Sequence, residues 1–483
     1  MGVLSDLKPQ AVFDYFEKLC AVPHGSGNTK IISDLCVSFA RELGLQYRQD
    51  ALNNVIIWKA GTPGYEDAAP IILQGHMDMV CAKEDGCGKD MAAEGLDLDT
   101  DGEWVWARQT TLGGDNCIAV AMILAILADS SLSHPPLEAV FTVDEETGMD
   151  GAFGLDCSDL KGRQLINLDS EEEGVFTVSC AGGARLDCLL PAARESAQDG
   201  ETGFALTLEG LLGGHSGSDI EKGRASANQV MGRVLYSALE RFPGLRLADI
   251  RGGRFDNVIC PANQAQVLVP RDKAGEFEAF VRDFDSVLKN EYAGKDDGIT
   301  LTCRSAPVDR AFTSEDTDRV LRTLLLLPQG VEAMSVDFPG LVQTSLNLGV
   351  MGVEEEGLKF SVSVRSSIAS QKEMLIQRVQ AVLRSGGGTA AARNGYPGWQ
   401  YVRQSVMRDR LLAVYREQTG KEGVIAGTHG GLECGLFIEK MPGLDVVSLG
   451  PELHNVHSPR ERLNVASTER VYQLVCRFLE RSK

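Results

Sequence analysis

The residues best suited to chemistry in this 483-residue chain are two adjacent carboxylates, Glu145 and Glu146, and two distant imidazoles, His76 and His457. Histidine and carboxylate side chains are ligands that divalent cations such as zinc prefer. A further carboxylate can take the proton of a metal-bound water, because the metal lowers the pKa of that water to about 7. The Glu145–Glu146 pair therefore predicts one general base and one metal ligand.

Five short polar motifs share one placement, since each follows an apolar strand or precedes an apolar helix. They lie at 75–78, 113–116, 144–148, 167–171 and 456–459. Residues i and i+2 of a strand face the same side, so Asp78 can orient His76. Asp115 stands where a carboxylate both caps a helix and faces a cleft. Each motif alone is typical of a turn, a cap or a solvated pair, and only their common placement favours a site.

The charges of such a site balance. Two dications bring four positive charges, of which Asp115, Glu146 and Asp169 would cancel three and a bridging hydroxide the fourth. Glu145 is then left over as the base. The expected cofactors are two divalent metal ions per chain; zinc fits best, and cobalt and manganese also tolerate this ligand set.

Composition excludes several classes of partner. The formal net charge of −21 repels nucleic acid and anionic membranes, and no run of 18 apolar residues is present. The first 19 residues lack the basic start and apolar core of a signal peptide. The 12 cysteines include no CxxC pair, which is typical of reduced thiols. We therefore expect a cytoplasmic protein.

Strands alternate with helices in 1–182 and 396–483, and this alternation predicts an α/β catalytic domain with a mostly parallel sheet covered on both faces. Its strands are expected at 54–58, 70–74, 137–143, 164–168 and 446–449, and its helices at 8–20, 28–43, 117–128 and 465–481. Sites in such sheets form at the carboxyl ends of the strands, so we expect the two metals there.

The pattern changes at Gly182-Gly183, after which apolar and polar residues alternate more strictly. Such segments lie at 204–208, 264–269, 299–303 and 359–364, with helices near 225–241, 272–290, 315–327 and 370–384. They predict a large α+β lid domain, 183–395, that interrupts the catalytic domain. Its length suits two α+β halves, 183–295 and 296–395.

Taken together, these motifs resemble the co-catalytic zinc peptidase family that includes carboxypeptidases, aminoacylases and dipeptidases. The family's motifs appear in order at 75–78, 113–116, 145–146, 169 and 457, and 213–217 is similar to its lid motif. The long insertion and the stretches 167–171, 430–435 and 456–459 are most similar to the aminoacyl-histidine dipeptidase branch. The resemblance covers essentially the whole chain. Cys117 departs from it, because related sequences usually have glycine there.

The resemblance implies five metal ligands: His76, Asp115, Glu146, Asp169 and His457. Asp115 would bridge both metals, with His76 and Asp169 completing one site and Glu146 and His457 the other. Asp78 would orient His76. Glu145 would be the general base toward a metal-bridging hydroxide and would later pass its proton to the leaving amine.

Substrate-binding roles are expected for five further residues: His215, Asn257, Arg365, His429 and Glu433. The resemblance implies that His215 donates a hydrogen bond to the tetrahedral oxyanion. The Arg365 guanidinium suits a terminal carboxylate, with Asn257 helping to hold that end. Glu433 could pair with a free substrate amine, and His429 could line the same pocket.

The expected activity is metal-dependent hydrolysis of small unblocked dipeptides, with Xaa-His types such as β-alanyl-histidine among the candidates. A deacylase or other amidohydrolase of N-acyl amino acids is an alternative on the same site. A non-catalytic metal-dependent binder is another, although a binder needs no base such as Glu145.

The long insertion also bears on the oligomeric state. In dimeric relatives with a short lid, the lid histidine is expected to come from the partner chain. Here the second half of the insertion could stand in for a partner's lid, so that His215 acts within its own chain. A homodimer stays compatible with this prediction.

Overall fold

The computed structural model describes residues 2–483; residue 1, where the first predicted domain begins, lies outside the described residues. The chain divides into two compact units. Unit 1 comprises Met1–Ser179, Tyr401–Gly427 and Leu432–Lys483, and unit 2 comprises Cys180–Gln400 and Thr428–Gly431. The insertion therefore forms unit 2, together with a four-residue segment that comes from much later in the chain.

Unit 1 is built on an eight-stranded sheet in the order β1-β2-β6-β3-β7-β23-β8-β22. The central pairs β6–β3, β3–β7 and β7–β23 are parallel, whereas β1–β2, β2–β6 and β23–β8 are antiparallel. The strands are β1 Gln46–Gln49, β2 Val55–Lys59, β3 Ile71–His76, β6 Leu137–Thr142, β7 Gln164–Asn167, β8 Val175–Cys180, β22 Val424–Thr428 and β23 Asp445–Ser448.

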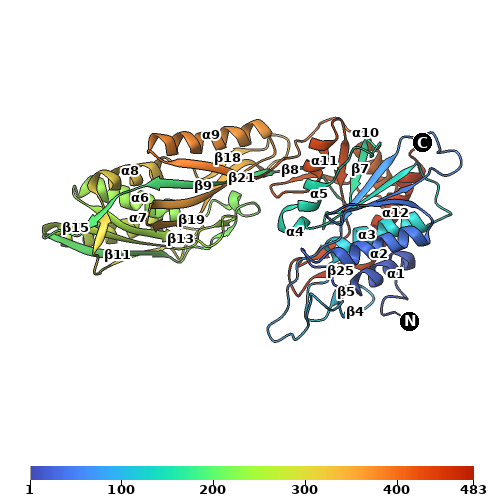
Figure 1. Ribbon diagram of the computed structural model, residues 1–483, viewed down its shortest axis with the longest axis horizontal. Helices are drawn as coiled ribbons and strands as arrows, with labels where there is room; N and C mark the ends of the chain where they lie inside the picture. Colours follow the sequence, from blue (N-terminus) through green and yellow to red (C-terminus); the bar gives the residue numbers. More distant parts are fainter. Residues whose placement is uncertain (1) are drawn as a thin grey trace. The chain divides into compact units, whose positions relative to one another are not determined.

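Helices cover this sheet on both faces, and every residue of β3 and β6 is buried as a result. The helices are α1 Gln10–Cys20, α2 Lys30–Glu42, α3 Gly114–Ala128, α4 Glu145–Gly148, α5 Asp150–Gly154, α10 Val406–Thr419, α11 Cys434–Lys440 and α12 Val465–Glu480. Helix α3 is apolar all round and lies with α1 and α2 (Figure 1). The predicted α/β class with a mostly parallel core is confirmed.

A small four-stranded sheet in the order β24-β25-β5-β4 joins two distant parts of unit 1. Its strands are β4 Leu98–Thr100, β5 Trp104–Ala107, β24 Leu453–His454 and β25 Arg462–Asn464. The pairing of β25 with β5 holds the β24–β25 hairpin, and that hairpin carries His457.

Unit 2 contains a nine-stranded antiparallel sheet in the order β16-β11-β15-β13-β19-β20-β9-β21, with β18 paired to β19. The strands are β9 Gly182–Pro191, β11 Glu201–Glu209, β13 Arg246–Gly252, β15 Asn263–Pro270, β16 Thr300–Ser305, β18 Gly330–Met334, β19 Val342–Glu354, β20 Gly357–Ser366 and β21 Thr389–Tyr396. Two short ribbons pair β10 Arg194–Ser196 with β17 Arg310–Phe312, and β12 Gly214–His215 with β14 Val258–Ile259.

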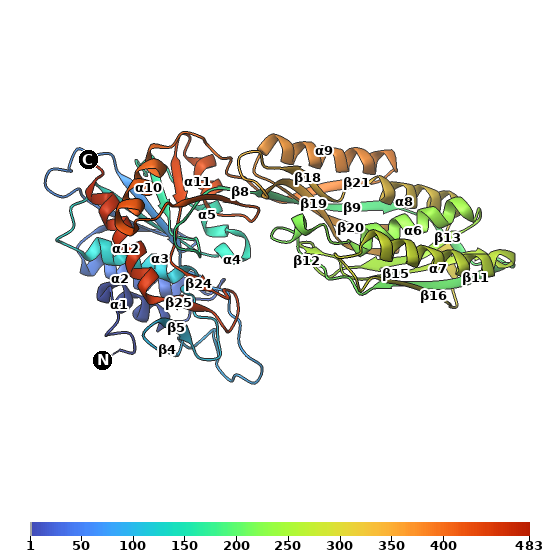
Figure 2. The ribbon, with the colours of Figure 1, turned by 180° about the vertical axis from the view of Figure 1, so that it is seen from behind.

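Four helices lie along this sheet (Figure 2). They are α6 Ala227–Arg241, α7 Ala274–Glu291, α8 Ser314–Leu326 and α9 Ala369–Ser385. On β20 the buried side chains Leu358, Phe360, Val362 and Val364 alternate with more polar ones, as expected for a sheet covered on one face. One hydrophobic core thus fills the space between the helices and the sheet.

The strands of the unit 2 sheet are not grouped by the two sequence segments 183–295 and 296–395. Strand β9, which comes early in the insertion, pairs with the late strands β20 and β21. Strand β16, which follows residue 296, pairs with the early strand β11. The two sequence halves therefore each supply a strand to the other's part of the sheet.

Among residues 2–483, no helix has both the length and the apolar character needed to span a membrane.

Candidate active site

The parallel strands of unit 1 end at one edge of the sheet. His76 at the end of β3 pairs in register with Thr142 at the end of β6. Gln74 likewise pairs with Asn167 at the end of β7. The polar motifs that follow these strands therefore meet at a common edge.

His76 faces two carboxylates through one ring nitrogen and is held through the other. Its Nε2 lies 3.1 Å from Asp115 Oδ1 and 3.4 Å from Asp169 Oδ1. Its Nδ1 lies 3.0 Å from the backbone oxygen of Asp78 and 3.3 Å from Asp78 Oδ1. This geometry leaves Nε2 as the atom directed at the carboxylates.

His457 faces the same cluster from the β24–β25 hairpin. Its Nε2 lies 3.2 Å from Asp115 Oδ2 and 2.9 Å from Glu146 Oε2. The two oxygens of Asp115 thus face two different imidazoles. Ligand atoms of His76, Asp115 and Glu146 all lie within 4.8 Å of one another, which is close enough to hold one metal ion.

Asp78 is fully buried and organises the backbone of the glutamate pair as well as the imidazole. It accepts hydrogen bonds from the backbone N–H of Glu145 at 3.1 Å and of Glu146 at 3.4 Å. The Ser26 hydroxyl also donates to it at 2.8 Å. Sequence reasoning missed Ser26, because a serine in a loop near the N-terminus carries no local signal of this contact.

The expectation that Asp115 caps a helix is wrong. Its carboxylate oxygens are directed at the two imidazoles, and its backbone, at ψ 101°, is not helical. The peptide bond between Asp115 and Asn116 is cis. The Asn116 side chain instead accepts a hydrogen bond from the His76 N–H and donates one to the Leu168 carbonyl.

The electrostatics of this cluster stabilise protonated imidazoles. Hydrogen bonds to Asp115 and Glu146 raise the pKa of His457 to about 11. Burial lowers the pKa of His76, but the charge of Asp169 and the hydrogen bonds to Asp115 outweigh it, so that pKa lies well above its usual range. Burial raises the pKa of Asp169 to about 6.

The surroundings of Glu145 disfavour its ionised form. Burial raises the pKa of Glu145 well above its usual value, and the charges of Asp169, Glu433 and Glu146 add to that effect. A carboxyl group with a raised pKa suits a residue that takes up and releases a proton.

Glu433, the residue expected to pair with a substrate amine, is fully buried. Its Oε2 accepts hydrogen bonds from Gln74 Nε2 at 2.6 Å and from Thr142 Oγ1 at 2.7 Å. Burial raises its pKa to about 7. The structure therefore places Glu433 beneath the strand ends and not on an open surface.

The other predicted substrate residues belong to unit 2, where three of them lie close together. The ring Nδ1 of His215 faces the backbone N–H groups of Gly217 and Ser218, at 3.3 and 3.2 Å. Burial and the charge of Arg365 lower the pKa of His215. The same two causes, in the same order, lower the pKa of His429 to about 3. Both imidazoles are therefore neutral near pH 7, and His215 carries its proton on Nε2.

The remaining contacts in this group fix its polar side chains. His429 Nε2 lies 2.7 Å from the Ser345 hydroxyl. One Arg365 nitrogen donates to the Tyr396 hydroxyl at 3.3 Å, whereas its buried Nε has no hydrogen-bond partner. Asn257 is close to His215 in the backbone, since its carbonyl accepts from the Ser216 N–H at 2.8 Å.

Two further buried residues, Cys117 and Glu461, lie near the carboxylate cluster. Cys117 is buried, and its thiol donates to the Met77 carbonyl at 3.5 Å. Glu461, which sequence reasoning missed, is buried against the backbone that precedes α3. Burial raises its pKa to about 7.

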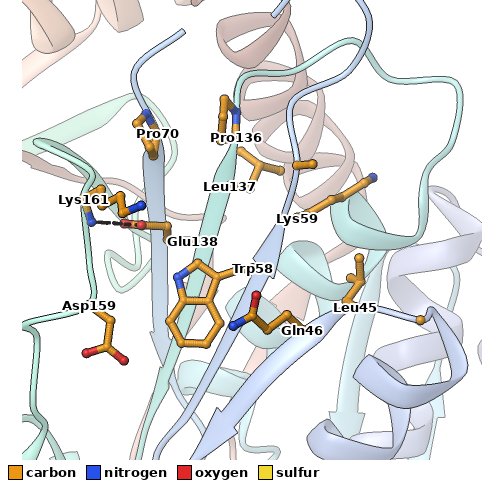
Figure 3. A pocket seen from close by; sticks show the side chains of 12 residues that line it. Leu45, Gln46, Trp58, Lys59, Pro70, Pro136, Leu137, Glu138, Asp159 and Lys161 are labelled. Carbon is orange, nitrogen blue, oxygen red and sulfur yellow. Dashed lines mark hydrogen bonds between the residues drawn. The ribbon is translucent and has the colours of Figure 1, made fainter. Parts of the chain in front are cut away.

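A cleft at the opposite end of the sheet, lined by Trp58 and by the starts of β3 and β6, contains none of the predicted site residues (Figure 3). Two of its charged side chains, Glu138 and Lys59, are engaged in hydrogen bonds. Glu138 accepts from the Lys161 and Gly162 N–H groups at 2.9 Å, and Lys59 Nζ donates to the Asp129 carbonyl at 2.9 Å. The chemistry therefore belongs to the carboxyl ends of the strands.

Comparison with known proteins agrees with this geometry. Residues 72–481 match the model of Peptidase family M20/M25/M40. The chain belongs to this family. The predicted family and the predicted class of enzyme, a metallopeptidase, are thereby confirmed.

Two relatives match over nearly the whole chain. It is 37% identical to the cytosol non-specific dipeptidase of Escherichia coli over 481 residues, which cover 99% of each protein. It is 35% identical to the crystal structure of aminoacylhistidine dipeptidase from Vibrio alginolyticus, with a TM-score of 0.92 and coverage of 99% of this chain and 98% of that one. An aminopeptidase from Bacillus cereus shares the fold alone, at 15% identity and a TM-score of 0.57 over 98% of each chain.

We predict that metal loading releases about two protons per chain at pH 7, because His76 and His457, the expected ligands, favour the protonated form and would lose their protons on binding a metal. The apparent metal affinity should therefore fall as the pH is lowered. Calorimetry in buffers of different ionisation enthalpy measures the release. His457→Gln should reduce it by about one proton. His454→Gln, in the same hairpin but paired with Glu452, should leave it unchanged. A heat of binding that is independent of the buffer would contradict this prediction.

Proposed function

We propose that this metallopeptidase hydrolyses unblocked dipeptides, including Xaa-His types such as β-alanyl-histidine. The observation that carries the proposal is the convergence of His76, Asp115 and Glu146, with Glu145 next to the last of these. The names of the two relatives that match over nearly the whole chain support a dipeptide as the substrate. The name of the first also supports action in the cytosol.

The donor set fits two divalent metals. We propose that His76, Asp115 and Asp169 bind one of them and that Asp115, Glu146 and His457 bind the other. Imidazole and carboxylate donors suit zinc, cobalt or manganese. The two oxygens of Asp115 face different imidazoles, which supports a bridging role. When bound, the metals would polarise the scissile carbonyl and make a water molecule more acidic.

Glu145 is proposed as the general base that takes a proton from the attacking water and passes it to the leaving amine. Its raised pKa in the metal-free chain shows how strongly this environment disfavours a further negative charge. Asp78 holds the backbone of Glu145 and the ring of His76, so one buried carboxylate positions both groups.

We propose substrate-binding roles for the residues of unit 2. His215 is a neutral imidazole with its proton on Nε2, which is the form that donates to a developing oxyanion. Arg365 has an unpartnered buried Nε and suits the terminal carboxylate of a dipeptide. Asn257 and His429 assist at that end of the substrate. The protein can act as a monomer or a homodimer in this proposal, with His215 serving its own chain.

The substrate class can be tested with Gly-His and N-acetyl-His, which differ in the free amine. We expect chelator-sensitive hydrolysis of Gly-His and little turnover of N-acetyl-His, because the acidic cluster favours an ammonium group nearby. Product release is followed by chromatography. Preferential hydrolysis of N-acetyl-His would favour a deacylase. Bound metal without hydrolysis of any dipeptide would favour a binding protein.

The two glutamates are separated by alanine variants. Glu145→Ala should retain the metals and lose about 10²–10⁴-fold in kcat, which is the usual contribution of a general base. Glu146→Ala should lose metal. Metal content by atomic absorption and kcat for Gly-His are the measurements. An empty site in Glu145→Ala together with a full one in Glu146→Ala would reverse the two roles.

Whether His215 acts in its own chain is tested by mixing His215→Ala with Glu145→Ala protein after dissociation and reassembly. We expect no recovery of activity, since neither chain then contains both groups. Reassembly of two wild-type preparations controls for losses. Activity that returns in the mixture would show that His215 acts across a subunit interface.

A further inference from the structure

Glu461 is a buried carboxylate that the proposed mechanism does not use. Its side chain is 2% exposed. Oε2 accepts hydrogen bonds from the Leu112 N–H at 2.7 Å and the Gly113 N–H at 3.1 Å, and Oε1 accepts from the Asp115 N–H at 3.2 Å. Burying a carboxylate is costly unless donors surround it, and here three backbone donors do so.

The segment 112–115 depends on these bonds because its backbone is irregular. Gly113 is left-handed at φ 66°, and the Asp115 backbone is not helical. A Cβ on Gly114 would lie 2.7 Å from Leu453 Cδ2 and 3.1 Å from Glu461 Oε1, so the segment packs tightly against the β24–β25 hairpin. Buried amides without a partner in a helix or strand need another acceptor, and Glu461 supplies it.

The other end of Glu461 is anchored in the hairpin that presents His457. The Glu461 N–H donates to the Ser458 carbonyl at 3.0 Å, which closes the turn after His457. The next residue, Arg462, begins β25, which pairs with β5. One carboxylate therefore ties the backbone of Asp115 to the hairpin of His457, although Asp115 and Glu461 are 346 residues apart in sequence.

We propose that Glu461 is a positioning residue for the metal centre. It holds the Asp115 backbone and the His457 hairpin at the separation at which both side chains reach one metal ion. The inference rests on the proposed function, because it takes Asp115 and His457 to be metal ligands. A pre-formed pair of ligands binds a metal more tightly than two segments that must first be brought together.

The test compares Glu461→Gln with Glu138→Gln in the full chain. Glutamine keeps the size of the side chain but turns one acceptor into a donor that opposes a backbone N–H. Glu138 is a matched control: it is 3% exposed and also accepts from backbone amides, but at the opposite end of the same sheet (Figure 3). Zinc affinity is measured by competition with a chromophoric chelator, and thermal stability by circular dichroism.

We expect Glu461→Gln to weaken zinc binding by about 10–100-fold, as is usual for groups that support metal ligands. Glu138→Gln should keep wild-type affinity even where it lowers the melting temperature equally. At saturating zinc, the KM of Glu461→Gln for Gly-His should stay at the wild-type value. Should Glu461→Gln fail to fold, Glu461→Asp keeps the charge with a shorter reach, and we expect a smaller loss of affinity.

Three results separate the possible failures. Wild-type zinc affinity in a folded Glu461 variant would overturn the positioning role alone. Equal losses in the Glu461 and Glu138 variants would also overturn it, by assigning the effect to general stability. Wild-type protein that binds no zinc would instead overturn the proposed function.

Discussion

Repulsion between carboxylates is the main constraint on the cluster at the strand ends of unit 1. Asp115, Glu146 and Asp169 face two imidazoles at 2.9 to 3.4 Å, and like charges this close need positive charge among them. The carboxylates favour the protonated form of the two rings, as the raised pKa of His457 shows. In the proposed two-metal site, divalent cations would supply this positive charge instead, and the rings would bind them in their neutral form.

Glu145 and Glu146 are neighbours on the short helix α4, but the electrostatic surroundings of their side chains differ. The backbone N–H groups of both donate to Asp78, so the backbone is common to them. Their side chains have different surroundings. Glu146 contacts the His457 ring, whereas Glu145 is in surroundings whose burial raises its pKa. These different surroundings support the proposed separation of a metal ligand from a general base within an adjacent pair.

Much of this arrangement could be predicted from the sequence because it depends on local patterns. Apolar strands followed by polar motifs located His76, Glu146 and Asp169, and the rule that parallel strands align their carboxyl ends brought them together. Side chains that act over long sequence distances could not be found in this way. Glu461 bonds to backbone amides, which are the same in every residue and carry no sequence signal. The burial of Glu433 could not be predicted either, because its partners, Gln74 and Thr142, belong to strands far from it in the chain.

The histidines of unit 2 are neutral because a positive charge lies near them, whereas negative charges lie near His76 and His457. Burial disfavours the charged form of His215 and His429, and the Arg365 guanidinium nearby adds a positive charge that opposes protonation. Two backbone N–H groups occupy the Nδ1 side of His215, so the tautomer is fixed by the fold and not by another ionisable group. A Cβ on Gly217 would lie 2.9 Å from His215 Cε1, which explains why glycine stands in this turn. Carboxylates around His76 and His457 favour the protonated form of those imidazoles, whereas burial and the arginine beside His215 favour its neutral form, which is the form the proposed oxyanion contact needs.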